Sequence, residues 1–477
     1  MGLIAAIEWP GVAGMIAFAD LFAVVLTILW VLTIKREPTS AIAWCLLVFF
    51  VPVAGIFLFI TFGYQSIHRP LKRKKRHARG YRTKPVHTLS PPATDTEGLA
   101  ALAERLGAMP MTGGNQVQFF HEPADAYVAM LDAIKQAKHH IHMEFFITRG
   151  DASGRRFMTA LAERAAAGVR VRFLYDAVGS WNFKHKVREI LTNAGGRAVS
   201  FLPLSNPLRR RLQINLRNHR KILVIDGQVG FTGGLNIGDE YLGLVARFGL
   251  WRDTFLRIDG PAVAGLQRVF GEDWDFAANE EFDGPEYFPV IQPAGAEAVQ
   301  IAWSGPDQDT KAVREVYFAA IMRARKRVWI STPYFVPDAP LADALALAAR
   351  SGRDVRIVVP FRPDKWVPLM ASRFIWQTLL EAGVKIFQFT AGFMHAKMMI
   401  VDDAWASVGS VNFDNRSLHL NFEVTALMES TALVAELEAA FRRDMARSIE
   451  VNAETFQRRP FVSKMAENAA RLASPIL

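Results

Sequence analysis

The chain has 477 residues, a net charge of +10 and a single cysteine, Cys45. One cysteine excludes an intrachain disulfide and a cysteine-based metal site. Nine Lys and Arg residues, with no acidic residue, fall within residues 69–84, which leaves a net charge of +1 on the other 461 residues. Charge concentrated in one segment argues against nucleic-acid binding, which needs a basic stripe across the folded surface, and favours a basic segment beside a membrane.

Two apolar runs come first, Gly11–Ile34 and Ala41–Phe62. Each is about as long as the roughly 20 residues that span a bilayer, and no basic segment precedes the first as in a signal peptide. We therefore predict a two-helix transmembrane hairpin. Because the basic segment follows the second run, the positive-inside rule places the N-terminus and the bulk of the chain in the cytoplasm. Asp20 either faces protein or water within the first span, or lies near the headgroups before a span that begins later.

The rest of the chain alternates helical and strand-like segments in two similar series. The first alternates helix and strand at 127–138, 141–147, 156–167, 169–175, 187–194 and 199–202. The second does so at 313–325, 328–335, 341–350, 355–358, 374–382 and 384–389, and a further strand closes each series at 222–225 and 398–401. This order predicts an α/β fold with two similar halves, each a central mixed sheet flanked by helices. The predicted segments are a hairpin 1–64, a basic segment and linker 65–114, and two domains, 115–290 and 291–477.

Each closing strand carries one pattern, a His and a Lys two residues apart, then an Asp and later an Asn. The two copies are His219, Lys221, Asp226 and Asn236, and His395, Lys397, Asp402 and Asn412. Residues two apart in a strand share a face, so the imidazole and ammonium groups of each copy lie side by side. An imidazole can attack phosphorus or move a proton, and an ammonium group can neutralise phosphate oxygens. A lone histidine of this kind is more often structural, but its duplication indicates a catalytic site where the two halves meet.

These residues and their surroundings resemble the phospholipase D superfamily and, within it, the bacterial cardiolipin synthases. The segments that carry the resemblance are NHRKILVIDG (218–227), GGLNIGDEY (233–241), TPYFVPD (332–338), FMHAKMMIVDD (393–403), GSVNFDNRSLHLNFE (409–423) and the membrane region 36–63. The resemblance covers nearly the whole chain. The paired motif is specific for the superfamily but is shared by its phospholipases, nucleases and transferases. Met394 stands where the family more commonly has Leu, a volume-conserving change.

The resemblance implies a two-step exchange at a phosphodiester. One histidine attacks phosphorus to give a phosphohistidine, and the other protonates the leaving oxygen and then deprotonates the incoming alcohol. The resemblance assigns the first role to His219 and the second to His395, although the residues alone also allow the reverse. Lys221 and Lys397 would hold the non-bridging oxygens, with the two asparagines as further donors. Because the two ammonium groups do the work of a metal ion, we expect neither a metal nor another cofactor.

Each catalytic histidine also needs a carboxylate that holds its other nitrogen in one tautomer. Glu423 stands at the family position after the second motif, and Asp253 is the matching candidate in the first half. The alternative for both is an ordinary surface ion pair. We expect Asp226 and Asp402, which end their strands, to fix the fold around the site.

Other residues near the motifs have a structural and a functional interpretation. Three glycines would let the backbone approach closely at the site: Gly233, Gly234 and Gly409. Four arginines are either a solvated face or a collar for anionic headgroups: Arg209, Arg210, Arg211 and Arg217. Four apolar residues are either core, which we favour, or a membrane-touching rim: Trp366, Met370, Phe374 and Trp376.

The resemblance implies a cardiolipin synthase that transfers a phosphatidyl group from one phosphatidylglycerol to another and releases glycerol. We expect it in the bacterial cytoplasmic (inner) membrane, with its catalytic halves on the cytoplasmic side and no nucleic-acid partner. Two alternatives use the same site: a hydrolase (phospholipase D or nuclease) and a transferase that uses phosphatidylethanolamine. A third, a lipid-binding protein without activity, conflicts with the intact His, Lys and Asn of both halves. The sequence does not indicate an oligomeric state.

Overall fold

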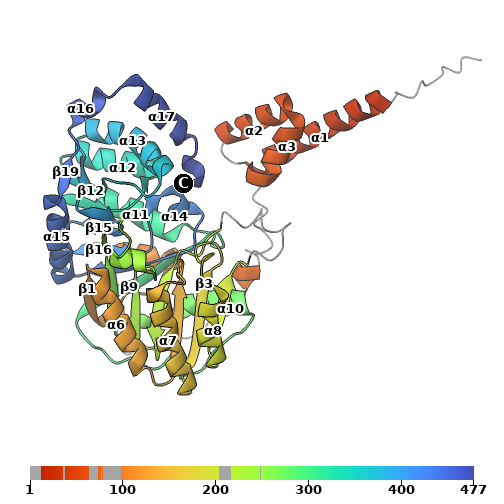
Figure 1. Ribbon diagram of the computed structural model, residues 1–477. Coiled ribbons are helices and arrows are strands. Elements are labelled where there is room, and N and C mark those ends of the chain that lie inside the picture. The colour runs from red at the N-terminus through yellow and green to blue at the C-terminus, as the bar shows by residue number, and fades with distance from the viewer. Residues whose placement is uncertain are drawn as a thin grey trace, which may run out of the picture. The chain divides into compact units, whose positions relative to one another are not determined.

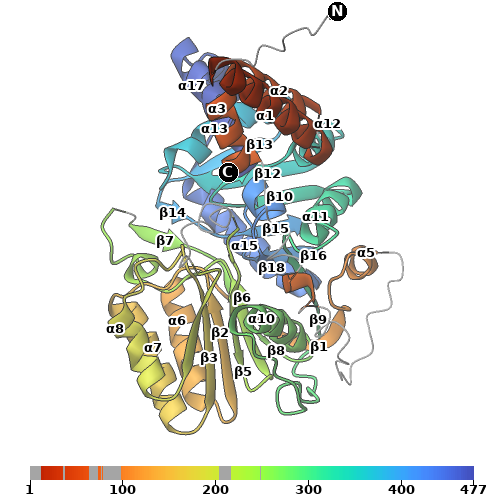
Figure 2. The ribbon, with the colours of Figure 1, turned by 90° about the vertical axis from the view of Figure 1, so that its right-hand side faces the viewer.

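The computed structural model describes residues 12–35, 38–63, 73–76, 78, 98–203, 216–247 and 249–477. The chain forms two compact units, residues 1–71 with 205–214 and residues 72–204 with 215–477. Both appear in Figures 1 and 2, the first in red and the second from orange to blue.

The first unit begins with helix α1 (Val12–Ile34), whose segment Ala17–Ile34 is long and apolar enough to cross a membrane. It is the one such helix in the part of the chain that the structure describes. Large side chains on it, such as Phe18 and Leu32, are exposed. A helix in the core of a soluble protein would bury such residues, so this exposure supports a lipid-facing helix.

The second apolar run does not form one continuous helix. It is divided into α2 (Pro38–Phe50), α3 (Pro52–Leu58) and the π-helical turn η1 (Phe59–Gly63). The break falls at Val51 (φ −134°, ψ 68°), because the residue before a proline is disfavoured in helical conformation. A side chain at Gly55 would lie 2.5 Å from the carbonyl oxygen of Leu47, so α3 packs closely against the end of α2. The described residues thus give one helix of spanning length and a bent second segment.

The second unit is built on one 15-stranded sheet (Figures 1 and 2). The strands of the first half are, in spatial order, β1 (Thr112–Phe120), β8 (Phe255–Asp259), β6 (Val229–Gly233), β5 (Lys221–Ile225), β2 (His140–Phe145), β3 (Arg170–Asp176) and β4 (Arg197–Phe201). The second half repeats this order with β9 (Glu297–Ser304), β18 (Glu423–Glu429), β16 (Trp405–Gly409), β15 (Met398–Val401), β10 (Arg327–Ser331), β12 (Asp354–Pro360) and β13 (Lys385–Phe389), and adds β19 (Ser448–Glu450). Strands β1 and β9 pair antiparallel and join the halves.

Both halves are mixed sheets with the same pairing. β2, β3 and β4 are parallel, as are β10, β12 and β13, whereas the motif strands β5 and β15 run antiparallel to their neighbours. The predicted α/β fold with two similar halves is therefore confirmed. The predicted boundaries at residues 65, 115 and 291 stay predictions; the sheet itself begins with β1 at Thr112.

Helices cover both faces of each half. In the first half they are α6 (Pro123–Gln136), α7 (Ala152–Ala166) and α8 (His185–Asn193) on one face, with α10 (Val263–Ala278) on the other (Figure 2). In the second they are α11 (Ala312–Arg323), α12 (Ala339–Arg350) and α13 (Trp366–Glu381), with α15 (Thr431–Ala446). The alternation along β10 shows the two faces, because Val328 and Ile330 join the core beneath α11 and α12 while Trp329 stacks on Phe441 of α15.

Shorter elements complete the second unit. They are α5 (Leu99–Arg105), η2 (Asp239–Leu242), α14 (Asn415–His419), α16 (Ala453–Gln457), α17 (Phe461–Arg471) and η3 (Ser474–Ile476), with the two-stranded pairs β11 (Phe335–Val336) with β17 (Phe413–Asp414) and β7 (Leu250–Arg252) with β14 (Gly392–Met394). The strand predicted at 328–335 ends at Ser331, since Pro333 cannot donate to a ladder. The motif strands do not close their series: β6, β8 and α10 follow β5, as β16, β18 and α15 follow β15.

Candidate active site

Two short stretches of parallel backbone pairing bring the halves together at the motifs. Asn218 pairs with Phe422, and the His219 amide donates to the Phe422 carbonyl at 2.9 Å. Met394 of β14 pairs with Arg252 of β7, and the His395 amide donates to the Arg252 carbonyl at 2.7 Å. In each case the next residues along the paired segments are a motif histidine and a carboxylate of the other half.

His219 is held by Glu423. Its Nδ1 lies 3.0 Å from both carboxylate oxygens of Glu423, and both side chains are buried. Ser410 Oγ donates to Oε2 of Glu423 and Asn421 Nδ2 donates to Oε1. The carboxylate is therefore fixed from several sides and fixes the imidazole in turn.

His395 is held by Asp253. Its Nδ1 lies 2.6 Å from Oδ2 of Asp253, whose Oδ1 accepts a hydrogen bond of 2.8 Å from the amide of Thr254. A side chain at Gly234 would overlap the Asp253 carboxylate, so glycine is required there. This agrees with the expectation that glycines allow close approach at the site.

The pairing crosses between the halves. Sequence position associates Asp253 with the first half and Glu423 with the second, yet Asp253 contacts the second-half histidine and Glu423 the first-half histidine. Spacing along the chain does not contain this information, because the partners are 142 and 204 residues apart. The site is consequently one composite of both halves, and neither half carries a complete set.

The motif lysines lie in the same buried site. Lys221 Nζ donates to the carbonyl of His219 at 2.6 Å, and Lys397 Nζ lies 2.9 Å from Nδ1 of His395. Burial lowers the pKa of Lys397 to about 8 and lowers the pKa of Lys221 well below its usual value. A lysine without its full hydration shell is a strong partner for an anion.

Burial also lowers the pKa of His219 to about 4 and that of His395 to about 3, with Lys397 adding to the effect at His395. Burial alone would raise the pKa of Glu423 and of Asp253, but the nearby His219 and Lys397 respectively outweigh it and hold both below their usual values. Near pH 7 the site therefore has two neutral imidazoles and two ionised carboxylates.

Both motif asparagines are buried. Asn236 Oδ1 accepts from the amide of Ile147 at 3.1 Å, which orients its amide group. Oδ1 of Asn412 is buried without a hydrogen-bond partner in the described part of the chain. A buried, unsatisfied amide oxygen is costly, so this side chain is available to a bound polar group.

The motif aspartates have a structural task. Asp226 (φ +53°) accepts from the amides of Lys138, His139 and His140, each at 2.8 Å, where β2 begins. Asp402 (φ +54°) accepts from the amides of residues 325, 326 and 327 at the start of β10. Each carboxylate ties its motif strand to the neighbouring strand, as expected of residues that fix the fold around the site.

Of the four arginines near the first motif, Arg209, Arg210 and Arg211 lie outside the described residues. Arg217 is buried, with Nη1 3.2 Å from Oδ1 of Asp176. Within the described ranges no group of three or more His, Cys, Asp or Glu side chains is arranged to hold a metal ion. The expectation of a metal-free, cofactor-free reaction stays a prediction.

Models of known protein families match the N-terminal segment and each of the two halves separately. A family model described as "Cardiolipin synthase, PLD-like domain" matches residues 130–274 and 317–445, and one described as "Phospholipase_D-nuclease N-terminal" matches residues 22–63. Cardiolipin synthases of Alkalihalophilus pseudofirmus and Geobacillus kaustophilus are each 41% identical over 93% of this chain and 90% of their own lengths. The chain belongs to the cardiolipin synthase family.

A solved structure supports the fold. The crystal structure of a phosphatidylserine synthase from Haemophilus influenzae is similar with a TM-score of 0.58, over 85% of this chain and 100% of that chain. At 15% identity the likeness concerns the fold alone.

This member of the cardiolipin synthase family also has a buried charged network that the sequence did not reveal. Arg220, between the motif His and Lys, binds Asp273 of α10 and donates to the carbonyl of Glu423 at 3.2 Å. Asp273 in turn binds Lys74 of the basic segment at 2.8 Å, and Lys74 also binds Asp307 at 3.2 Å. The network thus connects a residue of the basic segment to the backbone of the carboxylate that holds His219. The one sequence signal is Arg220 itself, a charged residue directly before the apolar strand β5.

Replacing Lys74 with Met is expected to destabilise the second unit by about 3–5 kcal/mol, because two buried aspartates lose the cation that they share. The measurement is the unfolding midpoint of the detergent-solubilised protein. The matched control is Lys75→Met, whose partner Asp309 is largely exposed, and which should change stability by less than about 1 kcal/mol. Equal effects of the two variants would contradict the network.

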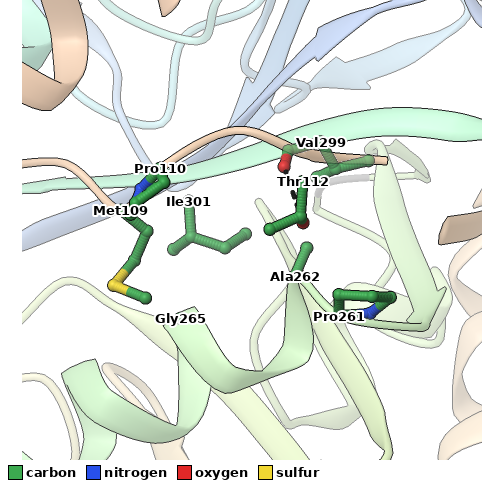
Figure 3. Close-up of a pocket in the computed structure, with 8 residues that line it drawn as sticks. All are labelled: Met109, Pro110, Thr112, Pro261, Ala262, Gly265, Val299 and Ile301. Atoms are coloured by element: carbon green, nitrogen blue, oxygen red, sulfur yellow. Dashed lines mark hydrogen bonds between the residues drawn. The ribbon is translucent and has the colours of Figure 1, made fainter. Parts of the chain in front are cut away.

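A separate cavity of about 70 Å³ lies between β9, α10 and the segment before β1 (Figure 3). Apart from Thr112, its lining is apolar: Met109, Pro110, Pro261, Ala262, Gly265, Val299 and Ile301. It contains no residue of either motif and no titratable side chain. We interpret it as a packing gap at the seam between the halves rather than a substrate site.

Proposed function

We propose that this protein transfers a phosphatidyl group from one phosphatidylglycerol to the free hydroxyl of another, giving cardiolipin and glycerol. The observation that carries the proposal is the pair of imidazoles, each with Nδ1 held by a carboxylate of the opposite half. This leaves Nε2 of each ring for the reaction. Membership of the cardiolipin synthase family supports transfer to a lipid alcohol over hydrolysis.

In the first step Nε2 of His219 attacks phosphorus, the bond from phosphorus to the glycerol oxygen breaks, and His395 gives its proton to that oxygen. In the second step His395 takes the proton of the incoming hydroxyl, the new P–O bond forms, and the N–P bond breaks. Each step has one bond made and one broken, and the proton returns to His395. The assignment of His219 as nucleophile follows the family pattern.

Neutral His219 is ready to attack, whereas His395 must first gain a proton. A phosphodiester anion between the rings would favour the protonated form of His395, as Asp253 already does. Lys221 and Lys397 would bind the non-bridging oxygens, and the amides of Asn236 and Asn412 would add hydrogen bonds. These donors are buried and fixed before substrate binds, which is the arrangement that stabilises a transition state most.

The pH dependence of kcat/KM should report Lys397. Its pKa is lowered to about 8, so its charge is present below that pH and is lost as pH rises through it. Since the reaction also needs protonated His395, whose pKa is lowered to about 3, log kcat/KM should already decline with unit slope across neutral pH, and the loss of charge on Lys397 should steepen this decline near pH 8. In Lys397→Arg the steepening should move up by more than one pH unit, because guanidinium stays charged. The exposed Lys135→Arg is the control, and an unmoved steepening in Lys397→Arg would contradict the assignment.

The product of phosphatidylglycerol alone tests the function. With phosphatidylglycerol labelled in its phosphate and its headgroup glycerol, we expect cardiolipin and free glycerol in equal amounts, with phosphatidic acid minor. Transfer can exceed hydrolysis only if the site positions the lipid alcohol and excludes water, and oriented groups reach effective molarities of about 10⁵ M or more. Phosphatidic acid as the main product would establish the hydrolase instead. Release of ethanolamine from added phosphatidylethanolamine would establish that lipid as a donor.

We further propose a location in the bacterial inner membrane, with two membrane-crossing segments and the catalytic halves on the cytoplasmic side. Helix α1 and the basic segment at 69–84 support this. In the described part of that segment, Lys74 and Lys75 are ion-paired with aspartates of the two halves. Fewer of its charges are therefore available to anionic lipid than the sequence suggests.

A further inference from the structure

Helix α17 (Phe461–Arg471) has its polar and apolar faces reversed relative to an ordinary surface helix. Phe461 and Val462 are 75% and 78% exposed, and Met465 and Leu472 are also exposed. The buried residue is Glu467, which binds Arg373 at 2.9 Å and Arg459 at 2.8 Å. A helix that pairs its carboxylate inward and turns its apolar stripe outward is not explained by the folding of the unit itself.

The apolar stripe continues onto α13, which packs beside α17 (Figures 1 and 2). Trp366 at the start of α13 is 69% exposed, and its neighbours Phe361 and Val367 are exposed as well. Of the four apolar residues considered for core or rim, Trp376 is fully buried and Trp366 is not. A hollow of about 480 Å³ lies between α13 and α17, bordered by Trp366, Met370 and Val462 among others. We call this surface the α13–α17 patch.

Cations outnumber carboxylates around the patch. The cations are Arg362, Lys365, Arg458, Lys464 and Arg471, none of them buried. Of the carboxylates on the same segments, Asp364 accepts a hydrogen bond of 2.6 Å from Tyr334 and Glu467 is buried in its two ion pairs, while Glu381 and Glu454 are exposed. Apolar and aromatic side chains within a rim of cations complement an anionic bilayer surface.

Both parts of the patch are connected to the active site. Tyr334, whose hydroxyl donates to Asp364, accepts a hydrogen bond at its carbonyl from Thr332 Oγ1. The same Oγ1 accepts from the amide of Phe413, the residue after Asn412. At the chain end beyond α17, the carbonyl of Leu477 accepts from the amide of Arg416 at 2.6 Å. The segment that carries Asn412 is thus held by both parts of the patch.

We propose that the α13–α17 patch inserts into the interfacial layer of a bilayer rich in anionic phospholipid and so holds the active site against its lipid substrate. The proposal deepens, and rests on, the proposed lipid transferase function. With 11 residues, α17 is too short to span and would lie in the membrane plane. This contact is separate from the anchor in the first unit and would set the orientation of the catalytic halves.

Lipid contact can be measured directly on the full chain in vesicles. Cys45 is replaced with Ser, and a single cysteine introduced at Val462 or Met465 carries an environment-sensitive fluorophore. In phosphatidylglycerol vesicles we expect a blue shift and strong quenching by lipids brominated along their acyl chains. Weaker quenching is expected when phosphatidylcholine replaces phosphatidylglycerol. The matched control is a label at Val128, an exposed apolar residue of α6 in the first half, which should remain unquenched.

A second arm measures function. Val462→Glu with Met465→Glu should lower the rate on vesicle phosphatidylglycerol roughly tenfold, the effect of losing about 1.4 kcal/mol of burial. The rate on a water-soluble short-chain phosphatidylglycerol should be unchanged, and Val128→Glu should change neither. Labels at 462 and 465 that stay unquenched by lipid would overturn the proposal. A blue shift without lipid quenching would also overturn it, since the patch would then be covered by protein. Quenching does not require turnover, so the quenching result can be interpreted even if the protein is not a transferase.

Discussion

His219→Ala and His395→Ala are each expected to lower kcat by at least about 10³-fold, because each removes a group that no residue of either half replaces. Each imidazole is held by a carboxylate from the opposite half, so the two histidines belong to one site. The loss should lie in chemistry rather than folding. Steady-state kinetics on phosphatidylglycerol vesicles, with circular dichroism to verify the fold, measures it. The control is His185→Ala, an exposed histidine on α8 that should leave the rate unchanged.

The same two variants can assign the roles. A phosphatidyl ester of p-nitrophenol has a leaving group that needs no proton, so its departure requires the nucleophile alone. His395→Ala should therefore release about one equivalent of nitrophenolate per active site and then stop, while His219→Ala should release none. A burst in His219→Ala instead would reverse the assignment. Wild-type turnover in either variant on phosphatidylglycerol would reject the two-histidine scheme.

The sequence predicted those parts of the fold that depend on local periodicity. The helices at 156–167 and 341–350 were found within a few residues, because apolar residues at helical spacing bury one face against the sheet. The motif strands were found because both are short apolar runs. Strands β6 and β16 were missed because their glycines weaken the strand pattern. These glycines are needed for close packing, since a side chain at Gly230 would lie 2.8 Å from Leu266.

The site was predicted in its residue types but not in its pairing. The repeated motif identified His219 and His395, and the family resemblance identified Glu423 and the matching Asp253. The crossed arrangement depends instead on the register of β7 with β14 and of Asn218 with Phe422. Such register is set by tertiary packing between halves and leaves no trace in local sequence. The burial of Lys74 was missed for the same reason, since its partners lie more than 190 residues away along the chain.

The crossed pairing leads to the second large effect, in Glu423→Gln and Asp253→Asn. Each amide keeps the shape of the carboxylate. Its oxygen accepts a weaker hydrogen bond from Nδ1–H of the histidine, and it has no negative charge to stabilise the protonated imidazole. A similar change in a serine protease triad lowers kcat by about 10⁴-fold, and we expect about 10²–10⁴-fold here on phosphatidylglycerol. The measurement is again steady-state kinetics on vesicles. Glu189→Gln, a change at an exposed carboxylate on α8, serves as the control.

The activated ester then separates the two carboxylates. Glu423 holds His219, so Glu423→Gln should slow the nitrophenolate burst itself. Asp253 holds His395, so Asp253→Asn should leave the burst nearly intact and slow the later turnover, in which the incoming alcohol must lose its proton. Pairing within each half would predict the opposite result. A burst that is lost in Asp253→Asn but retained in Glu423→Gln would have two explanations. Either His395 is the nucleophile instead of His219, or each carboxylate holds the histidine of its own half. The bursts of the two histidine variants distinguish these explanations.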